Sequence, residues 1–411
     1  MASVLGGIPG LRSGAAVLMA AAVAASVSGP AGASADTSGA ASGEGTEPPT
    51  ALPEAAMVTG GGECLPPSET VIGREVWTEG ALGLPEARGF ADGGGVTVAV
   101  VGSGVDDTAA ALDGAVEDAG QDCVGFGTFL AGIVAARPQD DSGTTGVAPA
   151  ARVLAVGVTD DRGVADAQDL ADGIGRAVDG GADVVLVGAP VPEAGGGSGR
   201  GSGVGAALRA AADADALVVA PATVPTDEAP VAALPGSAPG VLAVAATGPD
   251  GAPVATGPAV DADGEPVEVD LAAPGGAAMS VGPGGDGHFT SGGDAVAAAF
   301  VAGAAALLRS HEPGLSAAGA AERLTSTAYP APGAASATLL GAGTVDPVGA
   351  LTAVPAPQEA GAATEPAAFS PDPPTPPTVG RTLAVAGGSA LLILVSALGA
   401  AAVRYGRARG A

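Results

Sequence analysis

The sequence predicts an α/β domain in which a mostly parallel sheet carries helices on both faces, followed by one C-terminal transmembrane helix. Short apolar runs alternate with longer stretches of helical character, which is typical of parallel strands joined by crossover helices. The strands are expected at residues 96–101, 153–158, 184–188, 217–222, 241–246 and 267–272. The helices are expected at residues 128–136, 166–179, 204–214, 295–310 and 316–327.

The membrane helix is predicted from residues 382–403, which carry no charged side chain. A helix of about 20 apolar residues crosses a bilayer, and we place it at residues 381–403. Arg404, Arg407 and Arg409 follow, so the positive-inside rule puts the short tail in the cytoplasm and the domain outside. A buried helix is the alternative for this run, although no polar face can be drawn on it.

The N-terminus has the features of a cleaved signal peptide. Arg12 precedes an apolar run at residues 15–27, and Ala33, Ser34 and Ala35 form a small-residue cleavage motif. Residues 36–62 and 355–380 are too polar or too rich in Pro to form a core. For residues 355–380, a Pro-rich recognition segment is the alternative. The predicted organisation is a signal peptide at 1–35, a disordered arm at 36–62, the folded domain at 63–354, a Pro-rich stalk at 355–380, the transmembrane helix at 381–403 and a cytoplasmic tail at 404–411.

Composition narrows the range of partners. The formal net charge is −29 and the chain has no lysine, which argues against nucleic acid or anionic lipid head groups as ligands. Two cysteines and two histidines provide no Cys₄ or Cys₂His₂ pattern, so we expect neither a metal ion nor another cofactor.

Three sequence blocks frame the domain and follow one another in a distinctive order. The first, VTVAVVGSGVD at residues 96–106, is a buried strand that breaks into a tight turn. The second, DCVGFGT at residues 122–128, leads into an apolar helix. The third, GGDAVAAAFVAG at residues 292–303, enters a longer apolar helix. In this order the blocks resemble the segments that carry the catalytic Asp, His and Ser of the subtilisin-like serine proteases.

The resemblance implies a subtilisin-like fold whose catalytic groups are replaced. The family's Asp, His and Ser positions fall on Gly102, Phe126 and Ala295, and its oxyanion Asn position falls on Val224 in APATV. The chemistry needs a carboxylate, an imidazole, a hydroxyl nucleophile and an oxyanion donor. These four residues supply none of them, so the resemblance predicts a pseudoprotease with no catalytic residue.

A narrower resemblance is to the mycosins, the membrane-anchored subtilases of type VII secretion. It rests on Cys64, on Cys123 in its Asp-Cys pair, on GAGTVDPVGAL at residues 341–351, and on the Pro-rich segment before the terminal helix. It implies a Cys64–Cys123 disulfide, with two unrelated buried thiols as the alternative. It also implies membrane secretion-complex proteins as partners.

A relocated catalytic site is a separate possibility. His288 and His311 are the only imidazoles. Their possible companions are Ser291, Asp294, Asp106 and Asp107. We expect His311 at a helix C-terminus, where a cation complements the dipole, and Asp106 and Asp107 in a turn or at a helix start.

The strand that pairs with an extended substrate in subtilases is also altered. Here the apolar strand is followed by Gly188-Ala189-Pro190-Val191-Pro192, and Pro lacks the N–H that strand pairing uses. Peptide binding is therefore expected to be poor there, with a Pro-shaped groove for another ligand as the alternative.

Three interpretations of function remain open. The first is a non-catalytic assembly component of a membrane secretion system. The second is an active hydrolase with unrecognised catalytic groups. The third is a stalked envelope protein that binds a peptide or another envelope component.

Overall fold

The computed structural model describes residues 51–193, 203–226, 229–261, 264–331, 333–354 and 379–408. The predicted signal peptide, the first part of the predicted arm and most of the predicted stalk lie outside these residues.

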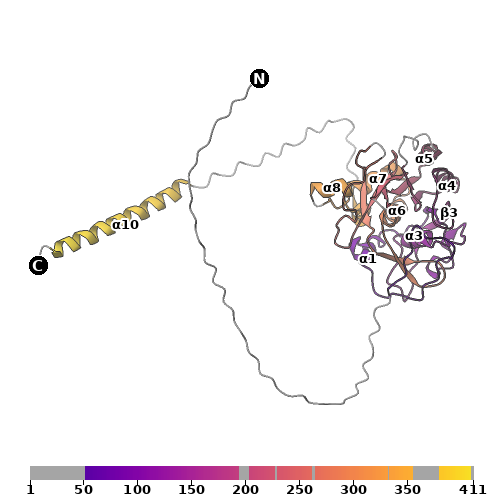
Figure 1. The fold of residues 1–411 in the computed structure, drawn as a ribbon, viewed down its shortest axis with the longest axis horizontal. Coiled ribbons are helices and arrows are strands. Elements are labelled where there is room, and N and C mark those ends of the chain that lie inside the picture. Colours follow the sequence, from indigo (N-terminus) through magenta and orange to yellow (C-terminus); the bar gives the residue numbers. More distant parts are fainter. Residues whose placement is uncertain are drawn as a thin grey trace, which may run out of the picture.

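A seven-stranded sheet forms the centre of the domain, in the order β10-β9-β6-β4-β1-β3-β2. Figure 1 shows the domain, with strand β3 of this sheet labelled. All of its pairings are parallel, as predicted. The strands are β1 Thr97–Gly102, β2 Val116–Glu117, β3 Arg152–Gly157, β4 Val184–Val187, β6 Leu217–Pro221, β9 Leu242–Thr247 and β10 Leu271–Pro274. The predicted start of β10, at residue 267, is wrong by four residues, because residues 267–270 are not strand and the pairing of β10 with β9 begins only at Leu271.

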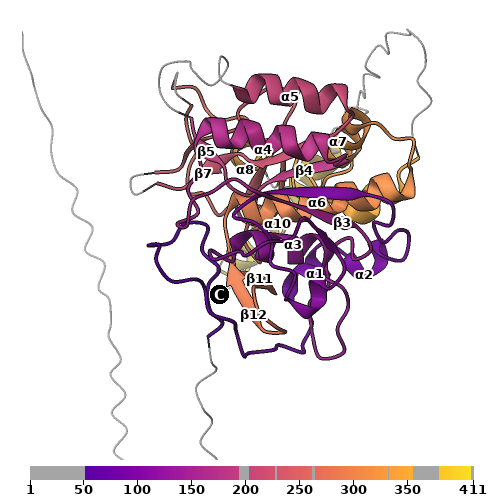
Figure 2. The same ribbon diagram turned by 90° about the vertical axis from the view of Figure 1, so that its right-hand side faces the viewer.

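Helices cover both faces of the sheet, and the side-chain alternation along β1 shows how. Val98 and Val100 belong to the apolar core that includes helices α3 (Phe126–Ala135) and α6 (Asp294–His311). Ala99 and Val101 belong to a second core with helices α4 (Ala167–Asp179) and α5 (Gly203–Asp213). Figure 2 shows α4 and α5 stacked on one side of the strands, with α3 on the other. The predicted two-faced α/β fold is confirmed.

Several short elements were not predicted. An antiparallel hairpin pairs β11 (Ala278–Val281) with β12 (His288–Ser291). A three-stranded antiparallel group has the order β5-β8-β7, with β5 at Val191–Pro192, β7 at Thr223–Val224 and β8 at Val231–Leu234. The remaining helices are α1 Trp77–Ala81, α2 Leu84–Ala87, α7 Ala317–Ser326, α8 Ala334–Leu340 and α9 Pro347–Thr352, with a 3₁₀ turn at Ala110–Leu112. Of these, only α7 was expected.

The prediction of a disordered arm through residue 62 is wrong for residues 51–62. Ala55 is fully buried, and its N–H donates to the Thr290 carbonyl at 2.9 Å. The Thr59 N–H donates to the Arg162 carbonyl at 2.9 Å. Backbone hydrogen bonds hold this segment on the domain, and the composition of the predicted arm as a whole, residues 36–62, gave no sign of them.

The predicted Cys64–Cys123 disulfide is confirmed. It ties the N-terminal segment to the turn before α3, and the Leu65 N–H donates to the Cys123 carbonyl at 2.8 Å.

The C-terminal helix α10 spans Val379–Ala408 and is longer than predicted at both ends. It therefore includes the last two residues of the predicted stalk and the first five of the predicted tail. Its stretch Gly388–Tyr405 has a mean hydropathy of 1.6 and is not buried by other described residues. By length and composition, this helix is able to cross a membrane.

Candidate functional site

The four positions singled out from the sequence lie around the carboxyl edge of the sheet, by which we mean the edge where its parallel strands end. Gly102 is the last residue of β1, and Val224 ends β7, directly after β6. Phe126 is the first residue of α3, and Ala295 lies in the first turn of α6. The carboxyl edge of a parallel sheet is where α/β proteins bind their ligands.

Hydrogen bonds join these positions in two pairs. The Gly127 N–H, next to Phe126, donates to Ser103 Oγ at 2.9 Å, beside Gly102. Thr223, next to Val224, contacts the carboxylate of Asp294, the residue before Ala295. Helix α3 packs on α6, which completes the frame of the site.

The side chains at these four positions have no reactive or hydrogen-bonding groups. Phe126, Val224 and Ala295 are 3%, 6% and 5% exposed. Phe126 and Ala295 belong to the main apolar core. Gly102 contributes no side chain. The four residues therefore add to packing and offer no nucleophile, base or oxyanion donor.

The turn that presents Phe126 is nevertheless firmly built. The buried Asp122 carboxylate accepts the Gly125 N–H at 2.8 Å on one oxygen. Its other oxygen accepts the Thr128 N–H at 2.8 Å and the Thr128 hydroxyl at 2.7 Å. This carboxylate satisfies donors that the first turn of a helix leaves open, and the disulfide at Cys123 adds a covalent tie.

Asp294 has a role that the sequence did not indicate. Its Oδ2 accepts the Thr223 hydroxyl at 2.5 Å and the Thr223 N–H at 3.2 Å, and its Oδ1 accepts the Ala246 N–H at 2.8 Å. Burial raises the pKa of the Asp294 carboxyl, and these hydrogen bonds offset the rise only in part. The carboxylate thus ties β7 and β9 to the start of α6 and occupies the donors beside Val224.

His288 is not paired with Ser291 or Asp294. It lies on β12, fully buried. Its Nδ1 accepts the Ile72 N–H at 2.8 Å, and its Nε2 lies 2.9 Å from Ser142 Oγ. Because Nδ1 is an acceptor in the neutral ring, the proton is on Nε2 and points to Ser142. This histidine therefore donates to the nearby hydroxyl and is not a base for it.

The remaining candidates have structural roles. The Ser291 hydroxyl donates to the Ala55 carbonyl at 2.7 Å. Asp106 Oδ1 accepts the Thr108 N–H at 2.8 Å and the Thr108 hydroxyl at 2.6 Å, as expected of a turn residue. Asp107 is exposed and lies in the same turn. His311 is the last residue of α6, as expected.

The strand after β4 is used inside the domain. Residues Val191–Pro192 pair with Ala233 and Leu234 of β8, and the Glu193 N–H donates to the Ala232 carbonyl at 2.9 Å. Pro190 and Pro192 bring no N–H to the other edge. Across the ranges that the structure describes, no group of three or more His, Cys, Asp or Glu side chains is placed to hold a metal ion.

Comparison with known proteins fits this geometry. The family model "Peptidase_S8: Subtilase family" matches residues 93–346, which contain the whole seven-stranded sheet and helix α6. The chain belongs to the subtilase family.

Similar proteins show to which group of subtilases the chain belongs. Mycosin-3 of Mycobacterium tuberculosis (strain ATCC 25618 / H37Rv) is 32% identical over 391 residues, covering 80% of this chain and 83% of mycosin-3. Mycosin-1 of the same organism is 30% identical over 331 residues, covering 67% of this chain and 73% of mycosin-1. A solved structure described as MycP3 protease from the type VII (ESX-3) secretion system superposes with a TM-score of 0.58 at 30% identity, covering 74% of this chain and 98% of that one. Within the subtilases, the chain is a member of the mycosin family.

Proposed function

We propose that this protein is a non-catalytic mycosin that serves as a structural component of a type VII secretion system. In this proposal Gly102, Phe126, Val224 and Ala295 stand at the family's Asp, His, Asn and Ser positions. The observation that carries the proposal is the carboxyl edge of the sheet, where apolar residues fill these positions and a buried carboxylate takes the nearby donors.

The expected fall in kcat supports the proposal that the protein is not an enzyme. In subtilisin, a member of the same family, loss of the nucleophile or the base alone lowers kcat about 10⁶-fold. Loss of its oxyanion Asn costs about 10²- to 10³-fold. These groups work as a unit, so their effects do not add. A chain without any of them retains no useful hydrolysis by this mechanism.

Asp294 strengthens the argument. Acyl transfer builds negative charge on the oxyanion, and an active site stabilises that charge with positioned donors. Here the Thr223 and Ala246 donors already hold a carboxylate, and Val224 offers no donor of its own. These donors are therefore not open to an oxyanion.

The secretion role is supported by the relatives. The solved structures similar to this chain include MycP1, described as an essential component of the type VII (ESX-1) secretion system, at 27% identity and a TM-score of 0.59. In our proposal, residues 1–35 are removed on export, α10 crosses the membrane once, and the segment at 355–378 spaces the domain from the outer membrane surface. The domain is then an interaction module for other membrane components of the secretion system.

Labelling of the full-length, detergent-solubilised protein with a fluorophosphonate probe tests the loss of catalysis. We expect no labelling and no cleavage of unfolded protein substrates. Cleavage that a serine-hydrolase inhibitor abolishes would overturn the non-catalytic assignment and favour an active hydrolase.

A rebuilt variant tests the assigned positions. It combines Gly102→Asp, Phe126→His, Val224→Asn and Ala295→Ser with Asp294→Thr. A Cβ atom at residue 102 would meet no atom closer than 3.8 Å, so the new carboxylate fits at its first atom. Labelling of the rebuilt protein, but not of a matched variant that keeps Ala295, would support the assignment.

The secretion role has its own test. Deletion of the gene in its native host is expected to stop export by the associated secretion system, and the unmodified gene is expected to restore it. Capture of the tagged full-length protein from solubilised membranes should recover other membrane components of that system. Normal export in the deletion strain would contradict the role.

A further inference from the structure

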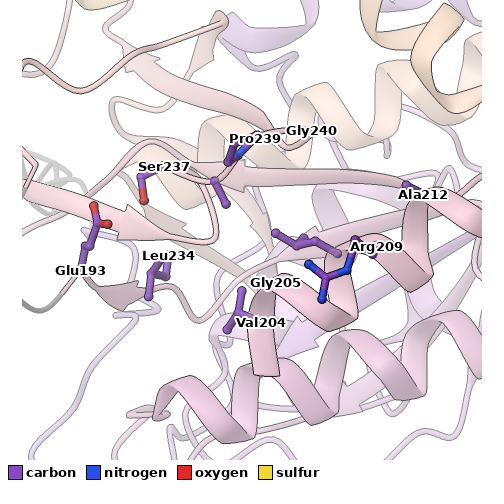
Figure 3. Close-up of a pocket in the computed structure, with 11 residues that line it drawn as sticks. Glu193, Val204, Gly205, Arg209, Ala212, Leu234, Ser237, Pro239 and Gly240 are labelled. Atoms are coloured by element: carbon purple, nitrogen blue, oxygen red, sulfur yellow. The ribbon is translucent and has the colours of Figure 1, made fainter. Parts of the chain in front are cut away.

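We draw no further inference here: the strongest candidate, the cavity of about 400 Å³ between α5 and the turn formed by residues 234–240 (Figure 3), carries nothing, because the unpaired Glu193 Oε2 and Ser237 Oγ atoms at its wall are too deeply buried for a ligand to reach and nothing in the structure shows what covers its apolar face.

Discussion

Acid is expected to loosen the N-terminal segment through His288. The side chain is fully buried, its Nδ1 accepts the Ile72 N–H at 2.8 Å, and its backbone N–H donates to the Thr70 carbonyl at 2.8 Å. Burial lowers the pKa of His288. Protonation would put a second N–H against that of Ile72, so the hydrogen bond between Ile72 and the His288 ring would be lost.

The sign of the effect follows from linkage. Because the pKa of His288 is lower in the folded state than the unfolded value of about 6.5, its contribution to stability is complete above that value and is lost as the pH falls through the folded pKa. One hydrogen bond is lost and the protonated Nδ1 of the buried His288 is left without an acceptor, which corresponds to about 1–3 kcal/mol of unfolding free energy.

Two substitutions, His288→Asn and His311→Asn, separate the effect of His288 from the titration of nearby carboxylates. The segments around His288 carry Glu69, Arg74, Glu75, Asp140, Asp141 and Asp286. His288→Asn keeps an acceptor close to the Nδ1 position but does not titrate, so it should keep the Ile72 contact and flatten the pH dependence. His311→Asn, at the exposed end of α6, keeps His288 and should therefore still lose the Ile72 contact in acid.

The assay is urea unfolding of each protein between pH 7 and about 4, together with NMR titration of the two histidines, the only ones in the chain. A His288 midpoint at or above about 6.5 would refute the reasoning. So would a His288→Asn protein whose stability falls with acid as steeply as that of the wild type.

Three further predictions test other parts of the molecule. Asp294→Asn should lower the unfolding free energy by about 1–3 kcal/mol because its amide N–H₂ faces the Thr223 donors. Since burial raises the pKa of Asp294, the wild type should lose stability relative to this variant as the pH rises through that pKa. A difference in urea unfolding that does not change with pH would contradict this prediction. Replacing Cys64 and Cys123 together by Ser should cost about 2–5 kcal/mol in thermal unfolding, with peptide mapping of the exported wild type recovering the pair as one linked peptide; two free thiols would argue against it. Ala295→Ser alone should not react with a fluorophosphonate, because Phe126 at the start of α3 cannot accept its proton, and fast labelling of this single variant would mean that an unrecognised base lies beside residue 295.

The main sheet and its large helices could be predicted because their signal is local. In β1 every residue is buried, so the strand is a continuous apolar run in the sequence. The α4 helix is capped by Asp166, whose side chain accepts the N–H groups of Gln168 and Asp169, and such a cap is visible from sequence alone. Strands of two residues, such as β5 and β7, have no periodicity to detect and depend on their partner β8.

The contacts that hold the site together could not be predicted, since they join residues far apart in the chain. Asp294 meets Ala246, 48 residues away, and His288 meets Ile72, 216 residues away. Each depends on a backbone N–H left open by the surrounding fold. Residues 51–62 were missed for the same reason, because backbone atoms of Ala55 and Thr59 hold that segment on the domain.

The same contacts explain how the frame around residues 102, 126, 224 and 295 is stable without polar side chains at these positions. The turn before α3 is fixed by Asp122 and the disulfide, and the start of α6 is fixed by Asp294. None of these supports uses the side chains at residues 102, 126, 224 or 295. Apolar residues at the last three of these positions are buried instead, and burying a large apolar side chain contributes about 1.5–3 kcal/mol. Polar side chains introduced at residues 126, 224 and 295 would therefore weaken this apolar packing, whether or not they gave catalytic activity. A rebuilt enzyme should be less stable than the present protein even if it becomes active, and a rebuilt variant of equal thermal stability would show that these positions contribute little to the core.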